Sequence, residues 1–415
     1  MNFNKIIFTA VLVSIGAIQT ALASDQSDSK GFIDDSSLTV KARNMYMNRD
    51  NRAPNATRSY GEEWAQGFIG TLQSGYTQGT VGFGVDAIGM LGLKLDTGGG
   101  RFGGGTNLLE TDSDGAKDEY SKAGGVFKMR ISNTVLKYGT QYSTIPVAGN
   151  TDSRLLPETM SGFTVSSKEF KNLRLDSGHL TGLTGRNQSN YDSGRMTALD
   201  YVGGVYKFSP QLSTQLYYAK TEDFFRKYYT NINYSIPLTQ LQSLTFDFNA
   251  YDTKSIEAQR SGDLDNLIWS MQGTYKVGAH SFSVAYQRVS GKGDYVYGPD
   301  GNANFWFANS VNYSDFNYED EKSWQAAYGL DMAPYGVPGL SFVARYVKGF
   351  DFKNGSGVDI DGKAWERDLE SKYVVQSGPA KDLSFRIRHA SYRSNERGGQ
   401  IDEVRVITEY PINIF

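Results

Sequence analysis

Segments of about ten residues in which apolar and polar side chains alternate recur along most of this chain. Val81, Phe83 and Val85 alternate with glycines and Asp86, and the stretch 244–250 (LTFDFNA) repeats the pattern. A period of two places successive side chains on opposite faces of a β-strand. Every apolar run after the first 23 residues is broken by polar or charged residues within a few positions, and convincing long helices are absent. The sequence therefore predicts an all-β fold.

Two architectures use strands of this kind, a soluble β-sandwich and a transmembrane barrel. The apolar faces often finish in Tyr, Trp or Phe, as the aromatic girdles of a membrane barrel require. Short turns such as FSPQ and VGAH alternate with long polar loops at 97–119 and 291–321. Short turns at one rim and long loops at the other are typical of an outer-membrane barrel. We therefore predict a transmembrane antiparallel β-barrel.

The first residues have the pattern of a secretory signal. A single positive charge, Lys5, precedes an apolar run to about Ile18, and the small-residue site Ala21-Leu22-Ala23 follows. The run is shorter than the roughly 20 residues of a spanning helix and has a cleavage site behind it. We expect residues 1–23 to be a cleaved signal peptide, residues 24–415 to form the barrel, and the protein to reside in the bacterial outer membrane. The absence of cysteine fits an envelope protein.

Positively charged side chains occupy one face of several predicted strands. In LSFRIRHASYR, Leu383, Phe385 and Ile387 alternate with Arg386 and Arg388. An arginine directed at the bilayer midplane costs about 2–4 kcal/mol, so both arginines are expected to face the lumen. The same argument directs four more arginines inward: Arg405, Arg345, Arg130 and Arg43.

The lumen is thus predicted to hold a concentration of guanidinium groups, although the chain has a formal net charge of −3. Taken singly, each arginine is better explained as half of an ion pair that braces the wall. Several arginines near the C-terminal strands, with few carboxylates expected on the same faces, favour an anion-conducting row.

The last residues, EVRVITEYPINIF, also alternate and end on an aromatic, Phe415. Outer-membrane barrels often end on a strand of this kind, which indicates that this segment closes the barrel.

Long blocks of the sequence resemble the OprD family of substrate-specific outer-membrane porins, also called Occ channels. They extend in order from GFIDDSSLTVKARNMYMNRD to EYPINIF and include SGYTQGTVGFGVDAIGMLGLKLD, AGGVFKMRISNTVLKYG, DSRLLPETMSGF, FANSVNYSDFN and KYVVQSGPAKDLSFRIR. The chain is most similar to the basic-amino-acid branch of that family. The resemblance implies a barrel of about 18 strands, a narrow eyelet formed by inward-folded loops, and a ladder of basic residues along one wall.

The resemblance also implies roles for particular residues. The ladder would contain Arg386, Arg388, Arg405 and Lys372, whereas Arg43, Arg130 and Arg345 come from the face assignment alone. The inward-folding loop would be 140–163, with Pro157 and Gly162 turning the chain back and Arg154 reaching the constriction. The long loop 291–321 would line the other side of the eyelet, with substrate-contacting positions at Ser310, Tyr313 and Asp315.

These residues suit the passage of amino acids. Guanidinium groups bind a carboxylate in bidentate fashion, while Asp315 on the opposite side holds a cationic end. The family's substrates are small, water-soluble carboxylates that move down their gradient, and carbapenem antibiotics enter through some members. We therefore expect a porin for basic amino acids and small peptides that acts as a monomer or loose homotrimer. Its other partners would be outer-membrane lipid, lipopolysaccharide and the assembly machinery, with no nucleic acid and no cofactor.

Two alternatives remain at this point. A scaffold barrel with partner-binding loops needs no ordered charge in its lumen, so the basic row favours the channel. Peptidase activity has been suggested for this family through a His/Asp/Ser set, and the matching positions here are His179, Asp223 and Asn304. The serine is missing, and without a nucleophile no acyl-enzyme forms. The three histidines are not spaced to bind a metal with a second ligand. We expect neither catalysis nor a metal site.

Overall fold

The structure is a computed structural model that describes residues 25–54, 56–303 and 305–415. The predicted signal peptide, residues 1–23, lies outside the described residues. The described chain forms eighteen strands and a short 3-10 helix, Ala333–Tyr335. The strands are β1 (Ser37–Asn51), β2 (Tyr60–Gln73), β3 (Val81–Asp96), β4 (Glu119–Ile131), β5 (Thr134–Gln141), β6 (Thr159–Ser167), β7 (Leu173–Thr184), β8 (Leu199–Lys207), β9 (Leu212–Thr221), β10 (Phe225–Thr239), β11 (Gln242–Ser255), β12 (Asp265–Val277), β13 (His280–Lys292), β14 (Lys322–Asp331), β15 (Leu340–Lys353), β16 (Asp359–Val374), β17 (Ser384–Ser394) and β18 (Gln400–Asn413).

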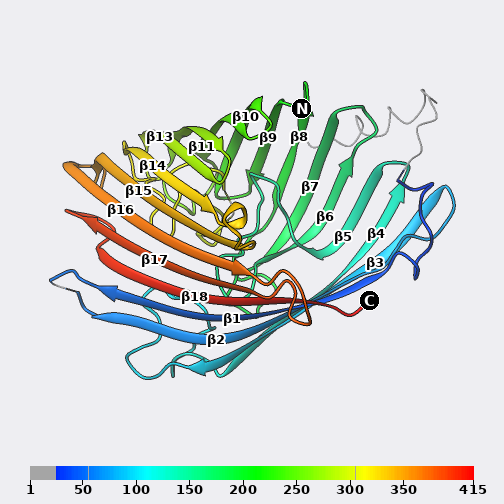
Figure 1. Cartoon of the computed structure of the whole chain (residues 1–415), viewed down its shortest axis with the longest axis horizontal. Helices are drawn as coiled ribbons and strands as arrows, with labels where there is room; N and C mark the ends of the chain where they lie inside the picture. The colour runs from blue at the N-terminus through cyan, green and yellow to red at the C-terminus, as the bar shows by residue number, and fades with distance from the viewer. Residues whose placement is uncertain (1–24, 55, 304) are drawn as a thin grey trace.

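All eighteen strands belong to one closed antiparallel sheet. Each strand pairs with the next along the chain, and β1 pairs with β18, from Thr39 opposite Asn413 to Asn51 opposite Ile401. Figure 1 shows β1, in blue, beside β18, in red. Closure leaves no unpaired sheet edge, which a lipid environment requires. The prediction of an antiparallel barrel of about 18 strands is confirmed.

The described part of the chain contains no helix that is long and apolar enough to cross a bilayer.

The two faces of each strand differ in polarity, as predicted. On β17, Phe385 and Ile387 are 46% and 54% exposed on the outer wall, whereas Arg386 and Arg388 are on the opposite face. On β18, Val406 is exposed on the outer wall, and its neighbour Arg405 is only 4% exposed. Alternation therefore separates a lipid-facing surface from a polar lumen, as in other membrane barrels.

Aromatic side chains form a row on the outer wall of β12 to β16. The ring of Trp269 packs against that of Tyr286, and Tyr346 packs between Trp324 and Trp365. Register links the two groups, because Tyr286 is directly opposite Trp324. Amphipathic rings of this kind are typical of the interface between hydrocarbon and headgroups.

Two long loops fold back against the lumenal face. The buried side chains of Leu155 and Leu156 pack with Met45 and Met47 of β1, and Phe307 packs in a second cluster lined by lumenal residues of β7 to β13. The first loop comprises residues 142–158 and the second residues 293–321. Both loops arise at the end of the barrel opposite the short turns, such as that at 278–279.

The predicted limits of these loops, 140–163 and 291–321, were too wide. Strands β5 and β6 continue to pair as far as Gln141 opposite Met160, and β13 extends to Lys292. Gly162 does not turn the loop. It lies within β6 at a register shift, with φ +150°, and an added Cβ would lie 2.3 Å from the carbonyl oxygen of His179. Close backbone approach therefore requires glycine there.

Candidate functional site

The loop 142–158 is held to the wall by Arg43, which points into the lumen from β1. Its NH1 and NH2 atoms donate to Oδ1 and Oδ2 of Asp152 at 2.7 and 3.0 Å, and NH1 also donates to the carbonyl oxygen of Arg154. Its Nε donates to Glu409 of β18 at 2.7 Å. Burial would raise the pKa of Asp152, but Arg43 and Lys41 outweigh it, so this pKa is lowered. Arg43, predicted to line the pore, is thus engaged as a loop anchor.

Arg154, in the second half of this loop, is buried. Its Nε donates to the carbonyl oxygen of Thr106 at 2.7 Å, and its NH1 to that of Ser153 at 3.0 Å. No carboxylate forms an ion pair with it among the described residues. Burial and the nearby charges of Arg405, Arg186 and Arg49 lower the pKa of Arg154 well below its usual value. Four arginines therefore lie near one another beside this loop.

The second loop is docked by two acidic side chains of β16. The carboxylate of Glu366 accepts hydrogen bonds from the backbone N–H groups of Tyr313 and Ser314, both at 2.8 Å. Asp368 accepts one from the N–H of Asn312 at 3.2 Å. From β18, Arg405 donates to the carbonyl oxygen of Asn312 at 2.6 Å. Arg405 therefore anchors loop 293–321, as Arg43 anchors loop 142–158.

Of the three predicted contact residues of this loop, Ser310 and Asp315 are hydrogen-bonded to each other, whereas Tyr313 contacts Arg49 and the carbonyl oxygen of Gly398. Ser310 donates to Oδ1 of Asp315 and Tyr297 donates to Oδ2, both at 2.5 Å. Burial raises the pKa of Asp315, an effect that these two hydrogen bonds oppose. The ring of Tyr313 lies 5.0 Å from the guanidinium carbon of Arg49. Since an ionised carboxylate offers about four lone-pair sites, Asp315 retains acceptor capacity.

The basic residues predicted from the C-terminal strands lie in adjacent positions. Arg388 of β17 is directly opposite Arg405 of β18, and Arg386 is opposite Lys372 of β16. The side chains of Arg386 and Arg388 are 28% and 27% exposed within the lumen. These two arginines and the half-buried Lys372 form the accessible part of the basic row.

The expectation of few carboxylates on these faces was wrong. Glu370 of β16 lies 2.7 Å from Nε of Arg388, and Glu403 lies 2.5 Å from the Nε atoms of both Arg405 and Arg49. Such partners arise because lumenal charges lose part of their hydration and are stabilised by pairing. The row is therefore a set of partly compensated cations.

Two further arginines lie away from this row. Arg130 is near the short-turn end, where its Nε donates to Gln26 at 2.9 Å and its guanidinium carbon is 4.1 Å from the Tyr76 ring centroid. Arg345 faces the lumen opposite Asp368 on β16.

His179, matched earlier to the peptidase set, pairs with Asp200 at 2.7 Å and is exposed on the outer wall. Asn304 lies outside the described residues. In the described ranges, no group of three or more His, Asp or Glu side chains is arranged to hold a metal.

Sequence reasoning missed several lumenal residues. Arg49 is on the same face of β1 as Arg43, and Glu370 is on the same face of β16 as Lys372, so alternation was a sufficient signal for both. Lys122 is on the same face of β4 as Arg130, so alternation could have placed it in the lumen, but not its contacts with loops. Arg186 lies in a loop and had no such signal.

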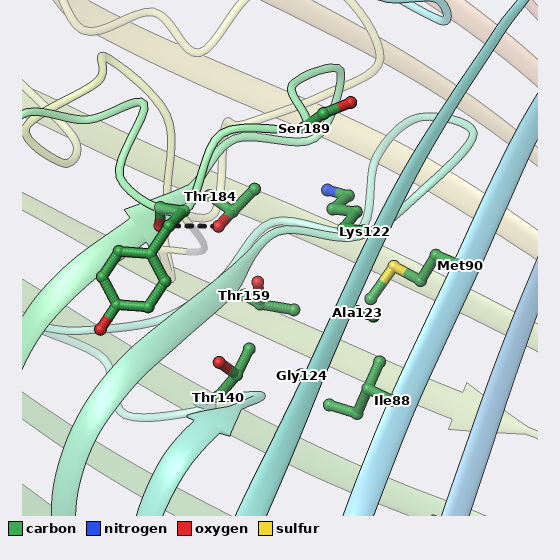
Figure 2. A pocket seen from close by; sticks show the side chains of 10 residues that line it. Ile88, Met90, Lys122, Ala123, Gly124, Thr140, Thr159, Thr184 and Ser189 are labelled. Carbon is green, nitrogen blue, oxygen red and sulfur yellow. Dashed lines mark hydrogen bonds between the residues drawn. The ribbon is translucent and has the colours of Figure 1, made fainter.

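Lys122 of β4 connects loop 142–158 to the loop of residues 185–198. Its Nζ donates to the carbonyl oxygens of Pro157 and Gly185 at 2.7 and 2.8 Å. Figure 2 shows this lysine beside a niche of about 110 Å³ whose lining includes Thr140, Thr159 and Thr184. Because backbone carbonyls bind the amine of Lys122, the polar part of the niche is formed by hydroxyl groups, next to an apolar part that includes Ile88 and Met90.

Comparison with known proteins agrees with this arrangement. Residues 30–414 match the family model described as outer membrane porin, OprD family. The chain is 46% identical to Porin D of Pseudomonas aeruginosa over 440 residues, covering 98% of both chains. It superposes on the crystal structure of OccK9 (OpdG) of P. aeruginosa with a TM-score of 0.88 and 36% identity, covering 93% of this chain and 100% of that one. The structure of P. aeruginosa OpdK with vanillate gives a TM-score of 0.84 and 32% identity, covering 92% and 100%. The chain belongs to the OprD family of porins and is a β-barrel channel of the bacterial outer membrane, not an enzyme.

Proposed function

We propose that this porin passes small carboxylate-bearing solutes selectively, with basic amino acids and small peptides as its main substrates. The observation that supports this most directly is the accessible basic row. Arg386, Arg388 and Lys372 present three cations to the lumen with Glu370 as the carboxylate paired to the arginines. A carboxylate solute entering this region meets a surplus of positive charge.

The chemistry favours transient binding. Guanidinium groups form two parallel hydrogen bonds to a carboxylate, while the ammonium or guanidinium group of a basic amino acid is attracted by Asp315 in loop 293–321. The solute is thereby oriented at both ends. Binding remains weak, because a channel conducts only if its solute leaves as readily as it enters.

The relatives support the substrate class. The OpdK structure was obtained with vanillate, whose carboxylate is the group that the basic row would recognise. We extend the proposal to carbapenem antibiotics, which also carry a carboxylate. We further propose that residues 1–23 are removed as a signal peptide, and that the barrel functions as a monomer or loose homotrimer.

Single-channel recording in planar bilayers tests this function. For Arg386→Ala combined with Arg388→Ala, we expect the reversal potential in a salt gradient to shift toward cation selectivity and carboxylate uptake into liposomes to fall. Arg130→Ala is the matched control, since it removes a lumenal arginine near the short-turn end. If the double variant and wild type have the same reversal potential and uptake, the basic row does not select solutes. A barrel without solute-dependent conductance would instead support a scaffold role.

A further inference from the structure

A polar groove of about 400 Å³ interrupts the outer wall of the barrel. It is lined by Asn48, Asp50, Arg52, Arg367, His389, Ser391, Arg393, Asp402 and Val404. We call this set the outer groove. It spans β16, β17, β18 and β1, which lie side by side in Figure 1. One register line crosses all four strands, with Arg367 opposite Ser391, Ser391 opposite Asp402, and Asp402 opposite Asp50.

The groove faces away from the pore. On β17, its residues alternate with the lumenal Arg388 and Tyr392 and share the face of the exposed Phe385 and Ile387. It also adjoins the outer aromatic row, because the guanidinium carbon of Arg393 lies 5.9 Å from the ring centroid of Trp365. The charged groove therefore continues the aromatic row on the lipid-facing surface.

Its depth in the membrane follows from the strand ends. Arg393 is near the end of β17, Asp402 is near the start of β18, and Asp50 is near the end of β1, all at the end of the barrel from which the long loops arise. In outer-membrane barrels the long loops are extracellular. The groove is thus at the level of the outer-leaflet headgroups, where charged side chains on the lipid face cost little.

The groove has cationic capacity that the protein does not use. Arg52 and Arg393 both pair with Asp402, at 3.0 Å, and Arg52 also pairs with Asp50 at 2.8 Å. Arg367 has no ion-pair partner in the described ranges. His389 Nδ1 is buried without a hydrogen-bond partner in the same ranges. Three guanidinium groups and an unsatisfied imidazole nitrogen therefore border a concave surface with only two carboxylates.

We propose that the outer groove binds the phosphorylated headgroup of the outer-leaflet glycolipid, lipopolysaccharide. Planar guanidinium groups bind phosphate in bidentate fashion. Arg367, opposite Ser391, is directly available, whereas Arg393 already donates to Asp402 and to the carbonyl oxygens of Tyr392 and Ile401. Asp402 holds Arg393 and Arg52 in place beforehand, which reduces the ordering cost of binding. Phosphate recognition by basic pockets at the membrane surface is a general mode of lipid binding.

The test uses purified full-length porin, stripped of lipid and titrated with defined glycolipid, with bound copies counted by native mass spectrometry. We expect wild type to retain bisphosphorylated lipid A in preference to its dephosphorylated form. Arg367→Ala, which breaks no ion pair, should weaken binding roughly tenfold, since a hydrogen bond to a charged group is worth about that much. Arg226→Ala is the control, because Arg226 is exposed on the outer wall of β10, on another part of the barrel.

Several outcomes would overturn the proposal. Equal retention of lipid A by Arg367→Ala and wild type would do so, as would equal binding of the dephosphorylated glycolipid. Displacement by millimolar inorganic phosphate, without preference for lipid A, would show that the groove takes free phosphate. Loss of oligomers in Arg367→Ala, with lipid retained, would show that the groove is a contact between copies. Heat-modifiable migration and unchanged conductance confirm that each variant forms the barrel.

Discussion

Arg388 and Glu370 are paired across β17 and β16, with the Nε of Arg388 2.7 Å from Oε2 of the carboxylate. The other carboxylate oxygen lies 3.6 Å from the Nε of Arg386. One negative charge therefore faces two positive ones. Glu370 reduces the positive potential of the basic row without cancelling it, and this balance determines how strongly the lumen attracts anions.

Replacing the counter-ion Glu370 should change the ion selectivity of the channel in a known direction. Glu370→Gln should shift the reversal potential in a salt gradient toward anion selectivity, opposite to the shift expected when Arg386 and Arg388 are removed. Carboxylate uptake should rise only a few-fold, since a partly solvated ion pair is worth about 0–1 kcal/mol. Glu396→Gln, in the exposed loop 395–399, is the control. A shift of Glu370→Gln toward cations would contradict the assignment of the row.

Asp315 distinguishes solute orientation from simple loop bracing. If it binds the cationic end of a basic amino acid, Asp315→Asn should slow lysine passage a few-fold relative to glutamate passage. If it only accepts hydrogen bonds from Ser310 and Tyr297, both fluxes should change alike. Liposome-swelling rates for the two solutes separate these cases. Ser310→Ala is a useful companion, because it disturbs the loop while leaving the charge in place.

Arg43 should control the position of loop 142–158. Arg43→Ala removes two hydrogen bonds to Asp152 and those to the carbonyl oxygens of Arg154 and Leu155. Breaking a buried ion pair costs about 3–5 kcal/mol, and the lower end applies because Asp152 is 46% exposed. We expect larger and noisier single-channel conductance. Arg130→Ala should leave conductance and noise unchanged. If Arg43→Ala has the conductance and the noise of wild type, contacts other than those of Arg43 hold the loop in place.

The stability of loop 142–158 in its position against the lumenal wall should depend on pH through Glu158. Burial, with the nearby charge of Asp300, raises the pKa of Glu158 to about 8, compared with about 4.3 for an unperturbed glutamate. A raised carboxyl pKa means that the folded loop binds the proton more tightly, so its stability falls as pH rises from about 4.3 to about 8. We expect current fluctuations to increase between pH 6 and pH 9 and Glu158→Gln to remove the increase. Identical pH profiles for both proteins would exclude this group.

The terminal residue should contribute to barrel assembly. The carbonyl oxygen of Phe415 accepts a hydrogen bond from the N–H of Leu38 at 3.2 Å, beyond the end of the β1–β18 ladder, and its ring is 62% exposed. Phe415→Asp should reduce the heat-modifiable protein recovered in outer-membrane fractions. Phe208→Asp places the same charge on an equally exposed aromatic at a short turn, and similar losses in both variants would mean that the effect is not specific to the closing strand.

The sequence by itself determined the barrel and the inward or outward face of the strands in which alternation is clear. In β17, the alternation of Phe385 and Ile387 with Arg386 and Arg388 was enough, because an arginine that faces lipid is costly whatever its neighbours are. The cost depends only on which face of the strand the arginine occupies, and the alternation of side chains along the strand shows that face directly. The same reasoning applied to Arg49 and Glu370 would have placed both in the lumen.

Only the tertiary structure decided what each lumenal charge does. Arg43 pairs with Asp152, which is 109 residues away in the sequence. Arg405 donates a hydrogen bond to the carbonyl oxygen of Asn312, which is 93 residues away. Alternation cannot distinguish these loop anchors from the more accessible Arg386 and Arg388, because all are inward residues of regular strands. The difference arises from strand register and from where two long loops fold back. Ion pairing depends on distances of a few ångströms across the closed barrel, which no spacing along the chain encodes.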